Sequence, residues 1–334
     1  MYLLKTYISG FMRKNLFILF ISFACISSLK AQQLPLYNQY MLNGYLVNPA
    51  VAGSDGYTTF SLTARSQWLG IPNAPNTQVF SFQTRVLKRS FIVRGNSVKR
   101  KSFKPSRSGR IGLGAYVFND MNGAMSRTGV HASYAYHIRI KENQLSFGLG
   151  GTAYQFHIQD LSFFEENEPL LSEGIYQPVF VPDADFGIYF LSYKYYAGIS
   201  VKNVMQSYLK LGNTSLDGYR LYRHYYVTGG YRFKINSRFA LEPSGMFRMS
   251  TQLSPQMDFN VKAYFMENIW AGLSFRTNGS LVSLFGVKVD RYYFGYAFDM
   301  GFSSIMKRTF GSHEFTLSVK LGDNARRYRW IERY

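Results

Sequence analysis

Hydrophobic and polar residues alternate along most of this chain with the two-residue period of a β-strand. In the segment 312–321, one face carries His313, Phe315, Leu317, Val319 and Leu321, and the other carries Glu314, Thr316, Ser318 and Lys320. The same split recurs at 130–140 and at 256–265. Segments of about ten residues with one apolar and one polar face are typical of tilted transmembrane β-strands, which contact lipid on one side and the barrel interior on the other.

The alternating segments predict fourteen strands, at 57–66, 77–86, 110–119, 127–140, 144–157, 183–192, 194–203, 221–235, 237–249, 255–266, 268–277, 280–289, 291–300 and 312–321. A soluble β-sandwich would also alternate, so the connections decide between the two folds. Five of the six even-numbered connections are tight turns, and the odd-numbered set includes the long stretches 160–182, 204–220 and 301–311. This division predicts an all-β fold, a transmembrane antiparallel β-barrel of the outer membrane with both termini in the periplasm.

Glycines and one proline occur inside the predicted strands. Glycines at 112, 114, 148, 150, 151, 229, 230 and 295 lie inside predicted strands, and no Gly-Lys-Ser/Thr follows them to suggest a phosphate-binding loop. We expect them to relieve crowding in a curved barrel wall. Pro243 cannot donate a ladder hydrogen bond, which predicts a bulge or a local bend in its strand.

The N-terminus reads as a secretory signal peptide. Arg13 and Lys14 precede an apolar run that ends near Ile26, and cleavage after Ala31 would remove Cys25, the single cysteine. Met12 is an alternative start, and lipidation of Cys25 is a second, weaker interpretation. We therefore divide the chain into a signal peptide (1–31), an N-terminal lead-in or plug segment (32–56), the β-barrel (57–322) and a basic C-terminal tail (323–334).

Charge is distributed unevenly along the chain. The formal net charge is +19, and it falls to +15 once the four cations of the signal peptide are removed. The stretch 88–110 holds nine basic residues and no acid, whereas 142–193 holds eight acids and no Lys or Arg. Either stretch could be a solvated loop or a docking site. An exported chain has no reason to bind nucleic acid, despite its basic composition.

Residue chemistry leaves three functional alternatives open. An enzyme would have to use the histidines, and His131, Ser133 and His137 share one polar face, with no carboxylate nearby in sequence to orient either ring. Asp160, Glu165, Glu166 and Glu168 supply oxygens that would suit calcium, but their spacing matches no defined calcium loop. A passive porin could be lined by the polar-face cations Arg65, Arg85, Arg139, Arg232, Arg248, Lys262 and Arg276. We expect no cofactor and no resident metal.

Several short motifs occur in order along the chain. The block 39–53 reads QYMLNGYLVNPAVAG, and it is followed by RSQWLG at 65–70 and APNT at 74–77. Further blocks are GLG at 112–114, Asn119-Asp120 with Gly123, YAY at 134–136, LSFG at 145–148, Pro243-Ser244 and GSHE at 311–314. In this order and spacing they resemble the PorP/SprF family, outer-membrane barrels associated with type IX secretion and gliding motility.

The resemblance implies a non-enzymatic accessory of protein export. Its partners would be a large secreted surface protein of the gliding-adhesin type, recognised through its C-terminal domain, and components of the type IX secretion system. An alternative role is a structural component of the machine that contacts its periplasmic ring. The family motif residues carried over are Gln39, Tyr40, Asn43, Asn48, Pro49, Ala50, Gly53, Arg65, Gln67, Trp68, Gly70, Pro75, Thr77, Asn119, Asp120, Gly123 and Glu314.

Two loops are candidate docking sites. The basic stretch, longer than the resemblance leads us to expect, would face peptidoglycan or a periplasmic protein through Arg94, Lys99, Arg100, Lys101, Lys104 and Arg107. The acidic stretch would meet an extracellular partner through Glu165, Glu166 and Glu168. The remaining contact expected of the barrel is outer-membrane lipid.

Overall fold

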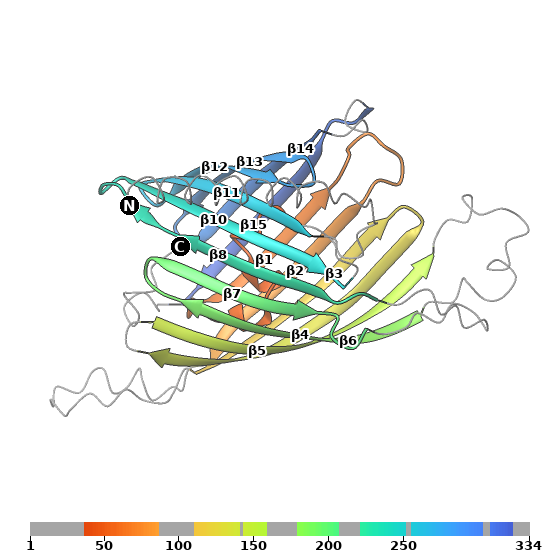
Figure 1. The fold of residues 1–334 in the computed structure, drawn as a ribbon, viewed down its shortest axis with the longest axis horizontal. Coiled ribbons are helices and arrows are strands. Elements are labelled where there is room, and N and C mark those ends of the chain that lie inside the picture. Colours follow the sequence, from red (N-terminus) through yellow and green to blue (C-terminus); the bar gives the residue numbers. More distant parts are fainter. Residues whose placement is uncertain are drawn as a thin grey trace, which may run out of the picture.

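Antiparallel strands close into a barrel in the computed structural model, which describes residues 37–86, 110–140, 143–158, 179–206, 221–251, 255–302 and 308–322 (Figure 1). The strands are β1 (Thr58–Ser66), β2 (Asn76–Val86), β3 (Ile111–Asn122), β4 (Met125–Ile140), β5 (Asn143–Ile158), β6 (Val179–Leu191), β7 (Tyr195–Lys202), β8 (His224–Tyr231), β9 (Phe233–Lys234), β10 (Phe239–Ser250), β11 (Gln256–Phe265), β12 (Ile269–Arg276), β13 (Ser280–Val289), β14 (Tyr292–Gly301) and β15 (Ser312–Leu321).

The sheet follows the order of the chain and then closes on itself. Each strand pairs with the next, except that β8 and β9 both pair with β10, and the pairing of β1 with β15 closes the ring. One residue, Arg232, separates β8 from β9, so these two segments act as one broken strand, and the barrel has fourteen strands. The predicted fold class is confirmed. No helix among the described residues is long and apolar enough to cross a membrane.

The two faces of each strand have opposite chemistry. In β11 the inward side chains Gln256, Asp258, Asn260 and Lys262 are buried, whereas the outward Phe259, Val261 and Phe265 are exposed. The barrel is therefore polar inside and apolar outside, the reverse of a soluble protein, because its outer surface is solvated by lipid. A shallow apolar groove of about 540 Å³ lies on this outer face over β12–β15.

The wall has one interruption, and it lies beside Pro243. Gly230 pairs with Ser244 and Phe233 pairs with Leu241, but between these two pairs the ladder that joins β8 and β9 to β10 is interrupted. The register is the same on both sides of the gap, so no residue has been inserted. Pro243 lacks the donor that pairing needs, and it interrupts the ladder as expected without producing the bulge that the sequence suggested.

The two ends of the barrel differ only in part as predicted. Tight turns follow β6, β9, β11 and β13, as expected, and we call this the turn end. At the opposite end, which we call the loop end, β3 and β4 are joined by only Gly123 and Ala124, and β12 and β13 by Thr277–Gly279. Of the predicted long loops, 160–178 and 207–220 lie outside the described residues. The last strand, β15, finishes at the turn end.

Candidate functional site

The barrel interior holds a segment of the chain itself. Residues 37–57, which we call the inner segment, precede β1 and include two short 3-10 helices, η1 (Gly44–Leu46) and η2 (Pro49–Val51). Most of their side chains are buried against the inner wall. The segment begins beside residues near the loop end and reaches β1 at the turn end, so it crosses the interior along its length (Figure 1).

A buried cluster of charges fixes the start of the inner segment. The Glu314 carboxylate accepts hydrogen bonds from the backbone N–H groups of Asn38, at 2.7 Å, and Gln39, at 2.9 Å. The Gln39 side chain donates to the Glu314 carbonyl at 3.1 Å. Arg276 donates to Asn38 Oδ1 at 2.9 Å. These bonds join the first described residues of the chain to β12 and to the last strand, β15.

In the same cluster, each arginine lies close to two carboxylates. Arg65 lies 3.0 Å from Asp299 Oδ2 and 3.9 Å from Glu314. Arg276 lies 3.2 Å from Asp258 and 3.4 Å from Asp299. We call Arg65, Asp258, Arg276, Asp299 and Glu314 the latch cluster. Its members are almost completely buried, and buried charges are stable only when they are paired and hydrogen-bonded.

Polar side chains hold the middle of the inner segment. Asn48 accepts a hydrogen bond from Ala50 N–H, which caps η2, and donates to the carbonyls of Ile188 and Ile199. Asn43 donates to Ser81 Oγ at 2.9 Å. One Asn side chain thus ties the segment to two neighbouring wall strands, β6 and β7.

Tyr45 ties the inner segment to β4. Ser133 Oγ donates to the Tyr45 hydroxyl at 2.9 Å, and His131 Nδ1 lies 3.2 Å from it. The Tyr45 hydroxyl can donate to His131 Nδ1 when the imidazole carries its proton on the other ring nitrogen. Asp185 lies 3.2 Å from the other ring nitrogen of His131.

The contacts of His131, Ser133 and His137 argue against the enzyme alternative. Sequence reasoning found no carboxylate beside His131, because Asp185 comes from β6 and is distant in the chain. Ser133 nevertheless bonds Tyr45, and His137 bonds Ser146 Oγ and the Ala52 carbonyl. The histidines thus hold the inner segment. Within the described ranges, no group of three or more His, Cys, Asp or Glu residues could hold a metal.

The turn end carries a second set of fixings. Lys320 lies 3.1 Å from the Asp55 carboxylate, and Gln144 donates to the Ser54 carbonyl at 3.2 Å. Gly53 has φ +64°, and a Cβ there would lie 2.6 Å from the Thr84 carbonyl oxygen, so the position admits only glycine.

Inward-facing glycines of the wall form the seats of the inner segment. A Cβ at Gly148 would lie 2.2 Å from Ala50 N, and one at Gly187 would lie 2.0 Å from Asn48 Oδ1. The same close approach occurs at Gly112, Gly114 and Gly295. Of the glycines that sequence analysis assigned to wall curvature, those at 112, 114, 148 and 295 thus have a different role, because they make room for the inner segment.

Gly148→Leu should therefore unseat the inner segment. Its side chain would overlap the backbone of Ala50, and such overpacking costs about 1–3 kcal/mol or more. We expect a clearly lower unfolding midpoint, measured by the heat-dependent shift of the barrel on gels. Gly151→Leu is the matched control, because a Cβ at Gly151 has no atom within 4 Å. Equal midpoints for the two variants would contradict the seating of Ala50 on Gly148.

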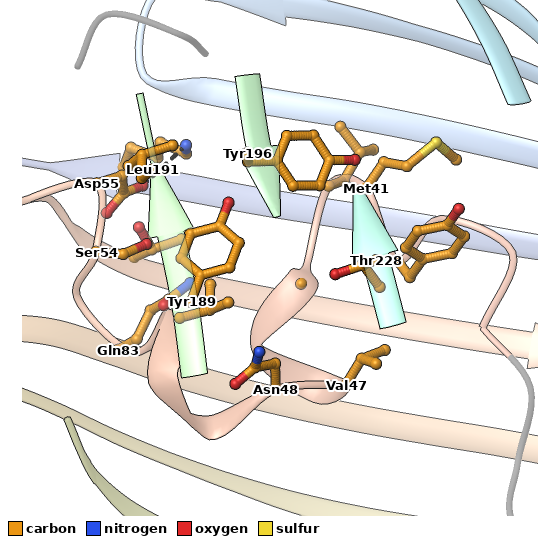
Figure 2. Close-up of a pocket in the computed structure, with 16 residues that line it drawn as sticks. Met41, Val47, Asn48, Ser54, Asp55, Gln83, Tyr189, Leu191, Tyr196 and Thr228 are labelled. Carbon is orange, nitrogen blue, oxygen red and sulfur yellow. Dashed lines mark hydrogen bonds and ion pairs between the residues drawn. The ribbon is translucent and has the colours of Figure 1, made fainter. Parts of the chain in front are cut away.

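Two small cavities of about 70 Å³ each flank the inner segment. The turn-end cavity lies between the segment and the inner wall, which β1, β2, β6–β8 and β15 form there. Figure 2 shows Tyr189, Tyr196 and Thr228 of these strands facing Met41 and Asn48. The loop-end cavity lies near the start of the segment and is lined by Tyr37, Arg127 and Arg248, among others. Neither cavity is wide enough for a folded domain.

The family motif residues fall into three places. One set belongs to the inner segment and its latch: Gln39, Tyr40, Asn43, Asn48, Pro49, Ala50, Gly53, Arg65 and Glu314. A second set, Gln67, Trp68, Gly70 and Pro75, builds the β1–β2 connection. There Gln67 N–H donates to the Pro75 carbonyl and Trp68 N–H to Ser312 Oγ.

The third set joins β2, β3 and β4 at the loop end. Thr77 donates to Asp120 at 2.7 Å, and Arg127 pairs with the same carboxylate. Asn119 accepts from Thr128, and Gly123, with φ +61°, makes the turn. The structure therefore places the first set along the inner segment and in its latch, from the loop end to the turn end, and leaves the other two sets at the loop-end rim.

Other predicted residues lie elsewhere. Arg94, Lys99, Arg100, Lys101, Lys104 and Arg107 are outside the described residues, as are Glu165, Glu166 and Glu168. Of the seven predicted lining cations, Arg139 is exposed and the other six are buried. The sequence analysis did not single out Asp258 and Asp299 of the latch cluster. Their position on the polar face of a strand could have indicated that they point into the barrel.

Three comparisons relate the chain to known proteins. The family described as type IX secretion system membrane protein PorP/SprF matches residues 29–319. No curated protein matches. Among solved structures, the outer membrane protein Omp33 of Acinetobacter baumannii has a TM-score of 0.42 at 7% identity, over 80% of this chain and all of its own. BamA from Haemophilus ducreyi, lacking POTRA domains 1–3, has a TM-score of 0.41 at 8% identity, over 79% of this chain and 70% of its own.

Proposed function

This chain belongs to the PorP/SprF family of type IX secretion system membrane proteins, and we propose that it is a non-enzymatic accessory needed for the secretion or surface retention of a large cell-surface protein. It is an outer-membrane β-barrel, as the closed sheet and the family together establish. The family is one of secretion-system membrane proteins rather than of enzymes. The gliding-adhesin type of cargo, recognised through its C-terminal domain, belongs to the proposal.

One observation supports a role in handling protein rather than solutes: the interior is filled by the inner segment. The segment is fixed at the loop end by Glu314 and at the turn end by Lys320, and its middle rests on wall glycines. A passive porin needs a continuous water-filled interior. In the described part of the barrel, the buried Arg65 and Arg276 bind carboxylates instead of lining a pore.

Deletion of the gene should lower the amount of the large surface protein on intact cells by at least tenfold, measured by surface labelling. Other substrates of the secretion system should reach the medium at wild-type levels. Loss of every substrate would instead assign the chain to the machine itself, as a component that contacts its periplasmic ring. Unchanged surface protein would contradict the proposal.

Co-purification identifies the partners directly. A tagged barrel extracted in mild detergent should bring down the surface protein, or secretion components, in amounts comparable to its own. The basic residues 94–107 are the proposed contact on the periplasmic side, with peptidoglycan or a periplasmic protein. A matched variant has those six cations changed to Gln. A partner that no longer co-purifies with this variant binds the basic residues, and a partner that still co-purifies binds elsewhere, such as at the loop end.

A further inference from the structure

The apolar groove on the outer face of the barrel, which we call the outer groove, is a hollow of about 540 Å³ in the lipid-facing wall. It crosses β12 to β15 and reaches β1. One edge is a row of outward side chains, each paired with the next across the strands: Ile269, Val287, Phe294, Leu317 and Leu62. The opposite edge begins at the small side chain of Ala271. Strands lie about 4.8 Å apart, so five of them span about 19 Å, which is comparable to the hydrocarbon depth of one leaflet, about 15 Å.

The first edge of the outer groove continues to the turn-end rim of the barrel. Ile269 pairs with Phe265, and Phe265 pairs with Phe239, the first residue of β10. The same row ends at Leu62, the middle residue of β1. The row therefore rises from the rim into the membrane, as expected for paired positions on tilted strands. A chain lying in the outer groove would pass from the membrane interface into the hydrocarbon layer.

The rim at the start of this row carries an excess of cations. The stretch between β8 and β10, together with the β6–β7 and β11–β12 turns, holds four cations and one carboxylate: Lys194, Arg232, Lys234, Arg238 and Glu267. Glu267 lies 3.7 Å from Lys234 and 3.8 Å from Arg232, so one negative charge faces two positive charges. Arg238 is exposed, and its carbonyl accepts a hydrogen bond from Met266 N–H at 2.7 Å. These cations thus lie beside the place where the groove meets the rim.

Farther along the same rim the charges are paired. Arg291 lies 3.2 Å from Asp290, and Lys320 lies 3.1 Å from Asp55. The outer groove therefore has excess positive charge near one end and an apolar wall along its length. This asymmetry matches an amphipathic molecule with an anionic head and an apolar tail, because cations at a membrane surface attract anionic lipid headgroups.

We propose that the outer groove binds one anionic phospholipid from the leaflet at the turn end. Its phosphate group contacts Arg238 and Lys234, and one acyl chain lies along the groove from Ile269 towards Leu62. The site depends on the outer wall alone, so it goes beyond the proposed function and does not require a secreted partner.

The test is lipid binding to the purified full-length barrel in detergent, with bound lipids counted by native mass spectrometry. The probes are phosphatidylglycerol, which is anionic, and phosphatidylcholine with the same acyl chains, which has no net charge. We expect one phosphatidylglycerol molecule per barrel, bound about tenfold more tightly than phosphatidylcholine.

Two variants separate the headgroup contact from the chain contact. The double variant Lys234→Gln, Arg238→Gln should lose the preference for phosphatidylglycerol, a fall of about tenfold in its affinity. Ala271→Phe places a ring in the outer groove and should weaken both lipids by about tenfold.

Matched controls lie on the opposite part of the wall. Arg110→Gln with Arg139→Gln removes two exposed turn-end cations beside β3 and β4, and Ala132→Phe adds the same ring to the outward face of β4. Both controls should bind the two lipids as the wild type does. Each variant is tested only after a heat-dependent gel shift shows that it has folded.

Equal affinity of the wild type for the two lipids would overturn the proposal, as would unchanged binding by Ala271→Phe. Loss of the preference in the Arg110, Arg139 control would also overturn it, because the overall charge of the barrel, and not the groove, would then select the lipid. A dimer of barrels without bound lipid would assign the groove to a second copy of this chain and reject the lipid.

Discussion

Deleting residues 38–54 should convert an electrically silent barrel into an open pore. Barrels of 16–18 strands leave an aqueous channel, whereas 8-stranded barrels are filled by their own side chains. At fourteen strands the wall encloses more space than its side chains fill, and the inner segment occupies that space. We expect the purified wild-type protein to show little conductance in a planar bilayer and the deletion variant to show large, stable steps.

The deletion needs a control for correct folding. A heat-dependent gel shift confirms that the variant still forms a barrel before it is tested. Large conductance by the wild-type protein would restore the porin interpretation.

Arg65→Leu should strongly destabilise the barrel. It removes the cation that lies between Asp299 and Glu314, and breaking a buried ion pair by removing one partner costs about 3–5 kcal/mol. We expect a marked fall in the urea concentration at which the barrel unfolds, and an inner segment that proteases reach in the folded protein.

Arg291→Leu is the matched control for this substitution. Arg291 forms an ion pair with Asp290 at the turn end, where both side chains are more than half exposed. Exposed pairs contribute about 0–1 kcal/mol. Equal midpoints for Arg65→Leu and Arg291→Leu would show that the latch cluster does not stabilise the fold.

The strands were predictable from the sequence because lipid contacts every second residue, which gives a clear alternation of apolar and polar residues. Every outward position meets lipid, so apolar and polar residues separate cleanly, and β13 and β15 begin and end where the alternation does. The break between β8 and β9 was not predictable in detail. Pro243 signals lost pairing, but whether the partner strand bulges or simply separates depends on the neighbouring strand.

The site was less predictable than the fold. The block 39–53 was recognisable as a structured segment, and its Asn-Pro-Ala turn indeed becomes the capped η2. Its position inside the barrel depends on contacts such as Asn38 with Glu314, 276 residues apart, which no local pattern encodes. The sequence shows that glycines lie inside the wall strands, but it does not show that the inner segment packs against them. Wall curvature was therefore the explanation that the sequence favoured.

The latch also sets the order in which the molecule can assemble. Glu314 and Lys320 belong to the last strand, yet they fix the two ends of the inner segment, which precedes the first strand. Arg65 and Glu314 are direct partners in the β1–β15 pairing, so ring closure and fixing of the inner segment are one event. Contacts of such sequence separation form slowly. Until the last strand has been exported and paired, the start of the inner segment lacks its Glu314 anchor and can be held only by its contacts with earlier strands.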